Sequence, residues 1–381
     1  MNKYYLMAPG PVSVNPHVML TMAEPIIHHR SPQFSAILTE VREHLKFLYQ
    51  TQNDVLIFAS SGTGGMEACV ANIMNPGDKA ICIVGGKFGE RWAELCDTYG
   101  AEHVDIEVQW GEAVDPARVK EALDAHPDAK AVFVQAHETS TGVKHPLKEL
   151  GELVKQRENT VLVVDAISAM GVYDIKTDEW GLDLVVTGAQ KSLSLPPGLA
   201  MVSVSNKAWR MAEEIKGPRY YFNFLKERKA IGKQTTAYTP AVSLIIGLGE
   251  VLKGFREIGL EKLFAHHRLL SGATRAAVQA MGLEVFARTP SEAITVIKAP
   301  EGVNGQDVVA ILRDEFGIQI AGGQAHLKGK IFRISHIGHL SQWDMIIAIA
   351  AIERALNRLG FKVDYGQGVA AAQEFFAANQ G

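Results

Sequence analysis

The chain has 381 residues, of which 47% are hydrophobic and 21% are charged, and its formal net charge is −4. A chain of this length and composition buries enough apolar surface to fold as a large domain with a smaller one, which excludes an intrinsically disordered protein. The weakly acidic balance, without a run of lysines or arginines, argues against nucleic acid as a partner.

The N-terminal residues and the cysteines indicate the setting of the protein. The first residues, MNKYYLMAPGPVSVNP, contain no apolar stretch of signal-peptide length, and no run of about 18 uncharged apolar residues occurs anywhere. We therefore expect a cytoplasmic protein without a membrane partner. The three cysteines, Cys69, Cys82 and Cys96, are odd in number and lack the spacing of a metal site. They predict buried thiols, with no disulfide framework and no metal.

Short apolar runs alternate with helical patterns from about residue 55 to residue 205. The runs are VLIFASS, KAICIVGG, AVFVQAHE, TVLVVDAIS, DLVVTGAQ and LAMVSVS. Because each run is continuously apolar, it predicts a strand that is covered on both faces, as in a mostly parallel sheet between layers of helices. The intervening segments, such as GMEACVANIMNPGD, fit crossover helices.

The pattern changes after about residue 240, where a long helical segment is followed by AITVIKAP, IQIAGG and IFRISHIG. This part predicts a smaller α+β domain. We therefore predict an α/β protein with an N-terminal segment (1–20), a large domain (21–260) with a mostly parallel mixed sheet, and a small C-terminal domain (261–381). The pattern DMIIAIAAIERALNRLG predicts a helix that ends at Gly360, and the tail after Asp364 is expected to be a loosely attached helix.

Two ionisable residues lie at the ends of predicted strands. Lys191 follows DLVVTGAQ, and a buried lysine loses its proton more easily, so that its neutral amine attacks carbonyl groups. Asp165 ends the run VLVVD, at the sheet edge where open α/β proteins bind ligands. A carboxylate there keeps a pyridine nitrogen protonated, so the pair predicts pyridoxal phosphate. The alternatives are a structural lysine at a strand end and an aspartate that caps the next helix.

A turn rich in small residues, SSGTGG at 60–65, separates the strand VLIFA from the helix that follows. Glycines there let backbone N–H groups approach a phosphate at the positive end of the helix, so Gly62, Thr63 and Gly64 predict a phosphate site. Any tight strand-to-helix turn, however, also favours glycine. The spacing breaks the G-x-G-x-x-G pattern of dinucleotide sites, and no Gly-Lys-Ser/Thr follows, so neither a dinucleotide nor a Walker loop fits.

Two further residues follow predicted strands. Phe88, in GGKFGERW, offers a ring that could stack on a flat heterocycle, although an ordinary core aromatic is an equally good interpretation. Thr139, in AHETSTGV, offers a hydroxyl that could reach the ring oxygen of a cofactor, although ETSTG is also typical of a turn.

The order and spacing of these segments resemble one protein family. The chain is similar over nearly its whole length to class V aminotransferases of the fold-type-I pyridoxal-phosphate enzymes, in the alanine-glyoxylate and serine-glyoxylate (serine-pyruvate) branch. The resemblance rests on APGP at 8–11, SGTGGMEA at 61–68, GKFGERW at 86–92, ETSTGV at 138–143, VVDAISAMG at 163–171, TGAQKSLSLPPG at 187–198, TPAVSL at 239–244 and FRISHIG at 332–338.

The resemblance implies a role for each residue of a cofactor site. Lys191 corresponds to the lysine that holds pyridoxal 5'-phosphate as a Schiff base, and Asp165 to the partner of the pyridine nitrogen. Thr139 corresponds to the hydroxyl near the ring oxygen, and Phe88 stands where many relatives have a stacking tryptophan. The implied phosphate contacts are Gly62, Thr63, Gly64 and Gln190.

The resemblance also implies a substrate contact and a second subunit. Arg333 corresponds to the arginine that binds the substrate carboxylate, and its planar fork binds a carboxylate with two hydrogen bonds, which a lysine does not reproduce. Thr239 corresponds to a residue that reaches the phosphate of the other subunit, with Thr236 a weaker candidate and Tyr238 left open. The implied protein is therefore a homodimer with shared active sites.

The implied function is transamination by a ping-pong mechanism between a small L-amino acid, alanine or serine, and glyoxylate or pyruvate. The small-molecule partners are thus amino acids and 2-oxoacids. Aspartate and 2-aminoethylphosphonate remain alternative donors, and a non-catalytic subunit that retains the fold remains an alternative of another class. A cysteine desulfurase does not fit, because all three cysteines lie before residue 100.

Overall fold

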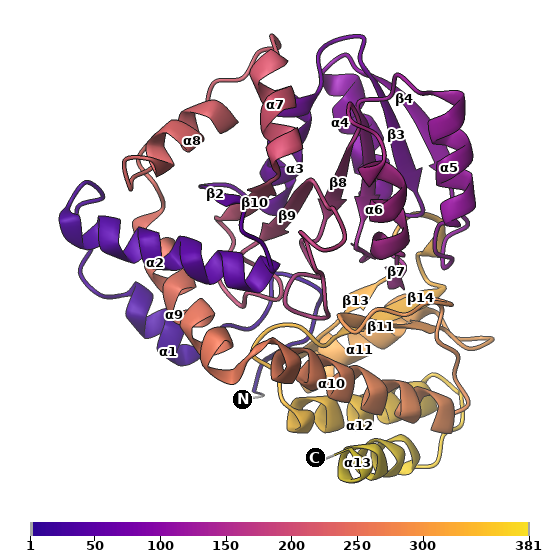
Figure 1. Ribbon diagram of the computed structural model, residues 1–381. Helices are drawn as coiled ribbons and strands as arrows, with labels where there is room; N and C mark the ends of the chain where they lie inside the picture. Colours follow the sequence, from indigo (N-terminus) through magenta and orange to yellow (C-terminus); the bar gives the residue numbers. More distant parts are fainter. Residues whose placement is uncertain (1–2, 380–381) are drawn as a thin grey trace.

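The computed structural model describes residues 3–379, and a seven-stranded sheet forms its centre (Figure 1). The strand order is β2-β10-β9-β8-β5-β3-β4, and β10 runs antiparallel to both of its neighbours while the other pairs are parallel. The strands are β2 (Asp54–Phe58), β3 (Lys79–Val84), β4 (Glu102–Glu107), β5 (Ala131–Gln135), β8 (Val161–Asp165), β9 (Leu184–Gly188) and β10 (Ala200–Val204). The predicted mostly parallel mixed sheet is confirmed.

Both faces of this sheet are apolar, which explains the continuous hydrophobic runs. In β8, Leu162 and Val164 belong to one core, while Val161 and Val163 point to the opposite face and belong to another. The first core is completed by α2 (Pro32–Tyr49), α5 (Pro116–Ala125), α6 (Leu147–Lys155) and α9 (Val242–Ile258). The second is completed by α3 (Gly62–Ile73), α4 (Lys87–Thr98), α7 (Asn206–Glu214) and α8 (Phe224–Ile231).

The buried cysteines were predicted correctly, whereas one strand of the sheet was not predicted. Cys69, Cys82 and Cys96 are all buried in the second core. The unpredicted strand, β4, has the sequence EHVDIE and lies at the edge of the sheet, where most of its side chains are at least partly exposed. A strand that is covered incompletely does not need a continuous apolar run.

The C-terminal part is smaller and has its own core. A three-stranded antiparallel sheet, in the order β11-β14-β13, packs with helices in the lower half of Figure 1. Its elements are α10 (Leu260–Ala280), β11 (Ile294–Lys298), α11 (Gly305–Phe316), β12 (Ile318–Gln319), β13 (Ala321–Gly322), a 3-10 helix (Ala325–Leu327), β14 (Ile331–Ser335), α12 (Gln342–Arg358) and α13 (Gln367–Ala378). This is the predicted α+β arrangement.

The tail after Asp364 is a helix, but the prediction that it is loosely attached was wrong. The carboxylate of Glu353 in α12 is buried and accepts backbone N–H bonds from Gly366 at 2.8 Å, Gly368 at 2.7 Å and Val369 at 3.2 Å. Phe376 of α13 is also buried. A carboxylate at the N-terminus of α13 satisfies donors that the helix cannot pair itself.

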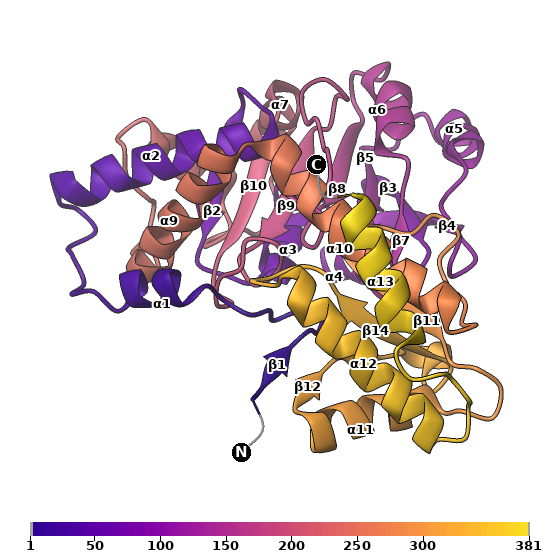
Figure 2. The same cartoon turned by 90° about the horizontal axis from the view of Figure 1, so that it is seen from below.

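The N-terminal segment joins the two parts. β1 (Tyr5–Leu6) pairs in parallel with β12, as Figure 2 shows, and the backbone of Met7 bonds to Gln319 and Ser335. The chain then reaches α1 (Pro16–Met22), which contacts α9 beside the large sheet. Residues 8–11 therefore pass between the small domain and the large one. Two short strands, β6 (His137–Glu138) and β7 (Val143–Lys144), form a further pair.

Among residues 3–379, no helix has both the length and the apolar character that crossing a membrane requires.

Candidate active site

A cavity of about 190 Å³ lies where several strands of the large sheet end. Seven of the predicted site residues line it: Gly62, Thr63, Phe88, Thr139, Asp165, Gln190 and Lys191. They follow or end β2, β3, β5, β8 and β9, and parallel strands bring their carboxyl ends to one edge of a sheet. The cavity is also lined by Arg91, Ile167 and Ser168, which the sequence did not single out.

Lys191 is held in the cavity by the N-terminal segment. Its Nζ donates a hydrogen bond to the carbonyl oxygen of Pro9 at 2.6 Å. A side chain on Gly10 would place its Cβ 2.5 Å from the same nitrogen, so the close approach requires glycine. Burial lowers the pKa of Lys191 to about 8; Arg333 and Arg91 act in the same direction, and Asp165 opposes them. The amine is therefore neutral far more often than that of an exposed lysine.

Asp165 lies at the end of β8 and is buried. Its Oδ1 accepts the backbone N–H of Ile167 at 2.8 Å. No helix begins between β8 and β9, so the interpretation of Asp165 as a helix cap was wrong. Burial raises the pKa of Asp165 to about 7, the negative charge of Glu138 adds to this rise, and Arg91 and Lys191 oppose it. A cation placed against the carboxylate would favour its ionised form.

The N-terminus of α3 opens at the cavity. Ser61 is the N-cap residue, but no side chain caps this helix end, so its first N–H groups are available to an anion. A Cβ on Gly62 would lie 2.6 Å from the Ile167 side chain, and one on Gly64 would lie 1.9 Å from Ser60 Oγ. The turn thus accepts only glycine at both positions without rearrangement.

Gln190 lies beside this helix end, and its side-chain oxygen would contact a Cβ on Gly188 at 3.2 Å. That oxygen is buried and has no hydrogen-bond partner within the described chain. Because the oxygen and nitrogen of a side-chain amide exchange places by a flip, the Gln190 amide is free to donate an N–H group to an anion at α3.

Phe88 lies in the first turn of α4, and a buried carboxylate fixes its position. Glu138 accepts the backbone N–H groups of Phe88 at 3.1 Å and Gly89 at 3.0 Å. The guanidinium of Arg91, one turn further along α4, lies 4.9 Å from the centre of the Phe88 ring and donates to Thr63 Oγ1 at 3.2 Å. Arg91 stands in the predicted motif GKFGERW, and its helical spacing from Phe88 was the signal that could have identified it.

Arg333 lies on β14 of the small domain and reaches the large one. Its Nε donates to the carbonyl oxygen of Gly322 at 3.0 Å, and its Nη1 donates to the carbonyl oxygen of Thr139 at 2.9 Å. Burial lowers the pKa of Arg333 to about 10, and Glu138 opposes this change. The guanidinium therefore stays charged at neutral pH, next to Thr139, which lines the cavity.

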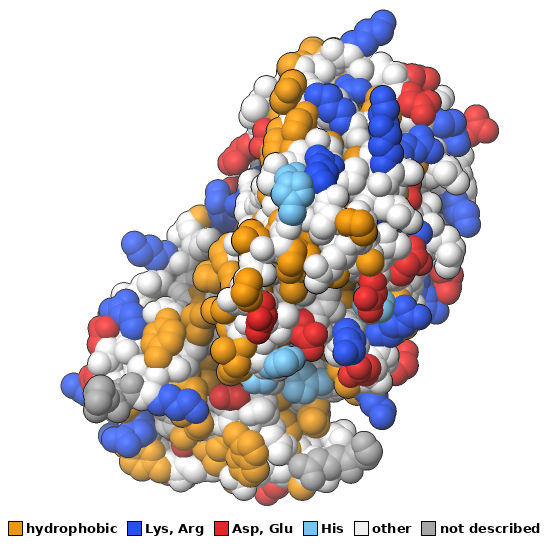
Figure 3. All heavy atoms as spheres, turned by 90° about the vertical axis from the view of Figure 1, so that its left-hand side faces the viewer, with side chains coloured by type: hydrophobic (Ala, Val, Ile, Leu, Met, Phe, Trp, Pro, Cys, Tyr) orange, Lys and Arg blue, Asp and Glu red, His pale blue; other side chains and the backbone are white. Residues whose placement is uncertain are grey.

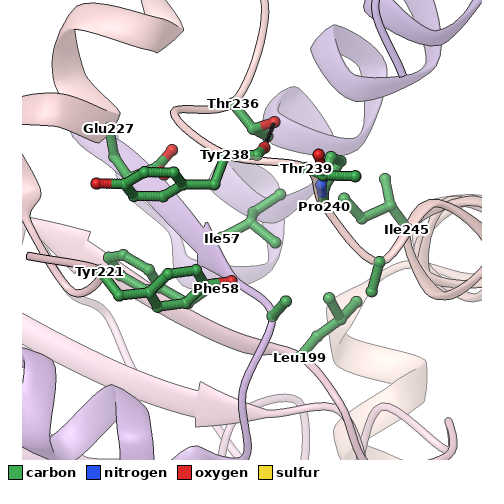
Figure 4. Close-up of a pocket in the computed structure, with 12 residues that line it drawn as sticks. Ile57, Phe58, Leu199, Tyr221, Glu227, Thr236, Tyr238, Thr239, Pro240 and Ile245 are labelled. Carbon is green, nitrogen blue, oxygen red and sulfur yellow. Dashed lines mark hydrogen bonds between the residues drawn. The ribbon is translucent and has the colours of Figure 1, made fainter. Parts of the chain in front are cut away.

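Thr236 and Thr239 lie elsewhere, in a second hollow beside Phe58 and Tyr221 (Figure 4). Within the described chain, its lining shares no residue with that of the cavity. The Thr236 hydroxyl donates to the carbonyl oxygen of Tyr238 at 2.6 Å, whereas the Thr239 side chain is exposed. The structure of one chain therefore does not bring these threonines to its own Lys191.

Comparison with known proteins identifies similar chains. The family model of class V aminotransferases matches residues 17–339. A serine–glyoxylate aminotransferase of Methylorubrum extorquens is 34% identical, covering 98% of this chain and 96% of the relative. An L-aspartate–glyoxylate aminotransferase of Paracoccus denitrificans is 35% identical, covering 97% and 95%.

Two further proteins are similar to this chain. A protein named as the small subunit of a soluble hydrogenase in a Synechococcus strain is 42% identical, covering 97% of this chain and 98% of the relative. The solved structure of a ureidoglycine–glyoxylate aminotransferase from Bacillus subtilis matches with a TM-score of 0.94 at 30% identity, covering 99% of each chain.

Proposed function

Because the chain belongs to the class V aminotransferase family, whose members depend on pyridoxal phosphate, we propose that it transfers the amino group of alanine or serine to glyoxylate or pyruvate. The observation that carries this proposal is the position of Arg333. A buried, charged guanidinium is bound to the backbone of Thr139, and Thr139 lines the same cavity as Lys191 and Asp165. A guanidinium that could bind a carboxylate, close enough to Lys191 to lower the pKa of its amine, supports the proposal.

The residues of the cavity fit pyridoxal phosphate. The uncapped N-terminus of α3 and the side-chain amide of Gln190 would hold its phosphate, and Phe88 would stack on its ring. Asp165 would face the ring nitrogen and Thr139 the ring oxygen. The bound cofactor supplies a protonated ring that delocalises negative charge from the carbon of the substrate.

Two residues handle protons in the proposed reaction. Lys191, whose pKa is lowered to about 8 by burial, serves as the base that removes the proton from the donor α-carbon and later returns one. Its bond to the Pro9 carbonyl oxygen keeps the amine in the cavity when it is free. Asp165 keeps a proton on the ring nitrogen, because a buried carboxylate is strongly stabilised by a cation in contact with it.

Arg333 orients the substrate. Two of its N–H groups are fixed by the Gly322 and Thr139 carbonyl oxygens, and a guanidinium has five such donors, so a fork remains for a carboxylate. Every amino acid and every 2-oxoacid carries this carboxylate. The same arginine would thus bind the donor and the acceptor in the two halves of a ping-pong reaction.

A panel of donors tests the proposed substrates. Alanine, serine, aspartate and 2-aminoethylphosphonate are each assayed with glyoxylate and with pyruvate, and kcat/KM is compared. We expect alanine or serine with glyoxylate to be preferred. A higher kcat/KM with aspartate or with the aminophosphonate would overturn the choice of a small donor but would leave the transaminase activity in place.

Aspartate is the second candidate donor because Arg91 provides another guanidinium in the cavity. The relative from Paracoccus denitrificans is named for aspartate and glyoxylate. If Arg91 binds the side-chain carboxylate of a donor, Arg91→Gln lowers kcat/KM for aspartate far more than for alanine. An equal loss for both donors would assign Arg91 to the cofactor instead.

A non-catalytic subunit is the alternative of another class, and the similarity to a hydrogenase subunit in a Synechococcus strain is the observation that favours it. The convergence of Lys191, Asp165 and Thr139 in one cavity favours catalysis. Turnover of any donor by the purified protein, lost in Lys191→Ala, would exclude this alternative.

We also propose that the enzyme is a homodimer with shared sites in the cytoplasm. Figure 3 shows hydrophobic side chains across the face formed by α1, α2 and α8, and several large ones are exposed there: Met19 (47%), Leu20 (69%), Ile26 (72%), Tyr220 (75%) and Tyr221 (39%). Exposed apolar groups of this kind mark interaction surfaces. The hollow that holds Thr239 adjoins Tyr221, so a second copy on this face would lie close to Thr239.

A further inference from the structure

Three buried side chains form a hydrogen-bonded series that leads from the interior to the cavity. His137 Nδ1 lies 3.0 Å from Ser168 Oγ, and Ser168 Oγ lies 2.7 Å from Thr139 Oγ1. His137 is 2% exposed, Ser168 4% and Thr139 5%. Thr139 and Ser168 line the cavity, whereas His137 does not. These hydrogen bonds therefore connect His137, which lies behind the site, to the Thr139 hydroxyl within it.

The direction of the hydrogen bonds follows from His137. The pKa of His137 is lowered to about 3, chiefly by burial and also by Lys191, Arg333 and His145, while a hydrogen bond with the Ser168 backbone opposes this change. The ring is thus neutral and carries one N–H. Its Nε2 is buried and has no partner within the described residues, so a proton there would be an unpaired buried donor. Such donors are rare in native proteins, which favours the proton on Nδ1, where Ser168 accepts it.

The two hydroxyls then have a permitted arrangement. Because Ser168 accepts from His137, its own proton is free to go to Thr139 Oγ1, and in that arrangement the Thr139 proton is free to point elsewhere. The backbone of Thr139 is held as well, because its carbonyl oxygen accepts Nη1 of Arg333 at 2.9 Å. When Thr139 Oγ1 accepts from Ser168, the Thr139 O–H can donate into the cavity that it lines.

We propose that His137 is a positioning residue that, through Ser168, leaves the Thr139 hydroxyl free to donate a hydrogen bond into the cavity, to the ring oxygen of the cofactor. This inference rests on the proposed function, in which Thr139 faces that oxygen. With the opposite tautomer, Thr139 would donate to Ser168 and present a lone pair to an oxygen that is itself an acceptor. His137 therefore determines whether the contact with the ring oxygen is attractive.

The consequence is measurable in the cofactor bound at Lys191. A donor to the ring oxygen stabilises negative charge there and makes the bound cofactor lose its proton at lower pH. Loss of the donor should raise the midpoint of the pH-dependent change in visible absorption. For a hydrogen bond to a charged group, the rise is about one to two pH units.

The experiment records the visible absorption of the holoenzyme against pH for a set of variants. Thr139→Val removes the donor and is expected to raise the midpoint by about one to two pH units. His137→Leu and Ser168→Ala are expected to raise it in the same direction. His137→Asn keeps an N–H near the position of Nδ1 and should restore the wild-type midpoint. The matched control is His145→Leu. His145 is another buried histidine, but it accepts the Val114 N–H at 3.1 Å and takes no part in the hydrogen bonds that join His137, Ser168 and Thr139.

The double variant decides whether His137 acts through Thr139. His137→Leu combined with Thr139→Val should have the midpoint of Thr139→Val alone, because residues in one network are not additive. Additive shifts overturn the proposal, and so does a wild-type midpoint in His137→Leu when Thr139→Val is shifted. In either case the aminotransferase function stands, since it is judged by turnover and by Lys191→Ala.

If Thr139→Val leaves the midpoint unchanged, the role of Thr139 at the ring oxygen is wrong and the inference is overturned with it. Ser168→Ala removes only one oxygen and keeps the test decisive if His137→Leu does not fold. Each variant is first checked for its thermal unfolding midpoint and its cofactor content.

Discussion

Replacement of Arg333 by alanine tests the substrate contact most directly. The structure leaves part of the guanidinium fork free, because Nε is bonded to Gly322 and Nη1 to Thr139. A hydrogen bond to a charged group contributes about 1.5 to 3 kcal/mol, so the loss of the carboxylate contact should raise KM roughly 10-fold to 100-fold. The increase should be similar for donor and acceptor, since both carry the carboxylate that Arg333 binds.

Steady-state assays of Arg333→Ala and Arg333→Lys separate charge from geometry. Lysine keeps the charge but not the planar fork, so its KM should lie between those of the wild type and the alanine variant. Because the contact is made in the ground state and in the transition state alike, kcat should change less than KM.

The matched control for this prediction is Arg275, an arginine of α10 in the small domain that donates to the carbonyl oxygen of Ser291 and does not line the cavity. Arg275→Ala should affect stability without raising KM. A folded Arg333→Ala enzyme with unchanged KM for both substrates would show that another residue binds the carboxylate.

Four further predictions concern the cofactor and the second subunit. Lys191→Ala should abolish transamination, and borohydride should fix the cofactor to the wild type only; attachment to a different lysine would contradict the assignment. Capture of the cofactor by cofactor-free protein should accelerate as pH rises through about 8, since Lys191 with its lowered pKa is deprotonated above that pH. Asp165→Asn should move this acceleration of cofactor capture to lower pH, because Asp165 raises the pKa of Lys191. The variant should also have a lower kcat, and a normal kcat would leave Asp165 without a catalytic role. Sedimentation should show a dimer, and Thr239→Ala should weaken cofactor binding more than Thr236→Val, whereas a fully active monomer would refute the shared site.

The sheet and the residues at the ends of its strands could both be predicted from the sequence, because the same apolar runs mark the strands and where each strand ends. A strand buried on both faces is a continuous apolar run, and the residue after it lies at the edge where ligands bind. The location of Lys191, Asp165, Phe88 and Thr139 at this edge was therefore predictable from their positions, whereas their roles rested on the family resemblance. β4 was missed for the opposite reason, since an edge strand with exposed side chains carries no such run.

Contacts between distant segments were not predictable in the same way. The carbonyl of Pro9 reaches Lys191 only because the N-terminal segment passes between the two domains, and nothing in the spacing of APGP specifies that contact. His137 was not predicted for a related reason, because its proposed role depends on Ser168, which follows another strand. The proposed contact of Thr239 with the site of a second subunit came only from the family resemblance, because nothing in the pattern around Thr239 specifies it.

The attachment of α13 depends on Glu353, which leads to a prediction about stability. Its two oxygens accept three backbone N–H groups at the start of α13, and the side chain is 2% exposed. In Glu353→Gln, one oxygen becomes an NH2 group that faces the Gly366 N–H or its neighbours, so at least one buried donor loses its acceptor. The cost is about 1 to 3 kcal/mol. Hydrogen exchange should therefore accelerate in α13 while the amides around Lys191 keep their protection, because those amides belong to another core. Unchanged exchange in α13 would mean that burial of residues such as Phe376, rather than the carboxylate, holds this helix in place.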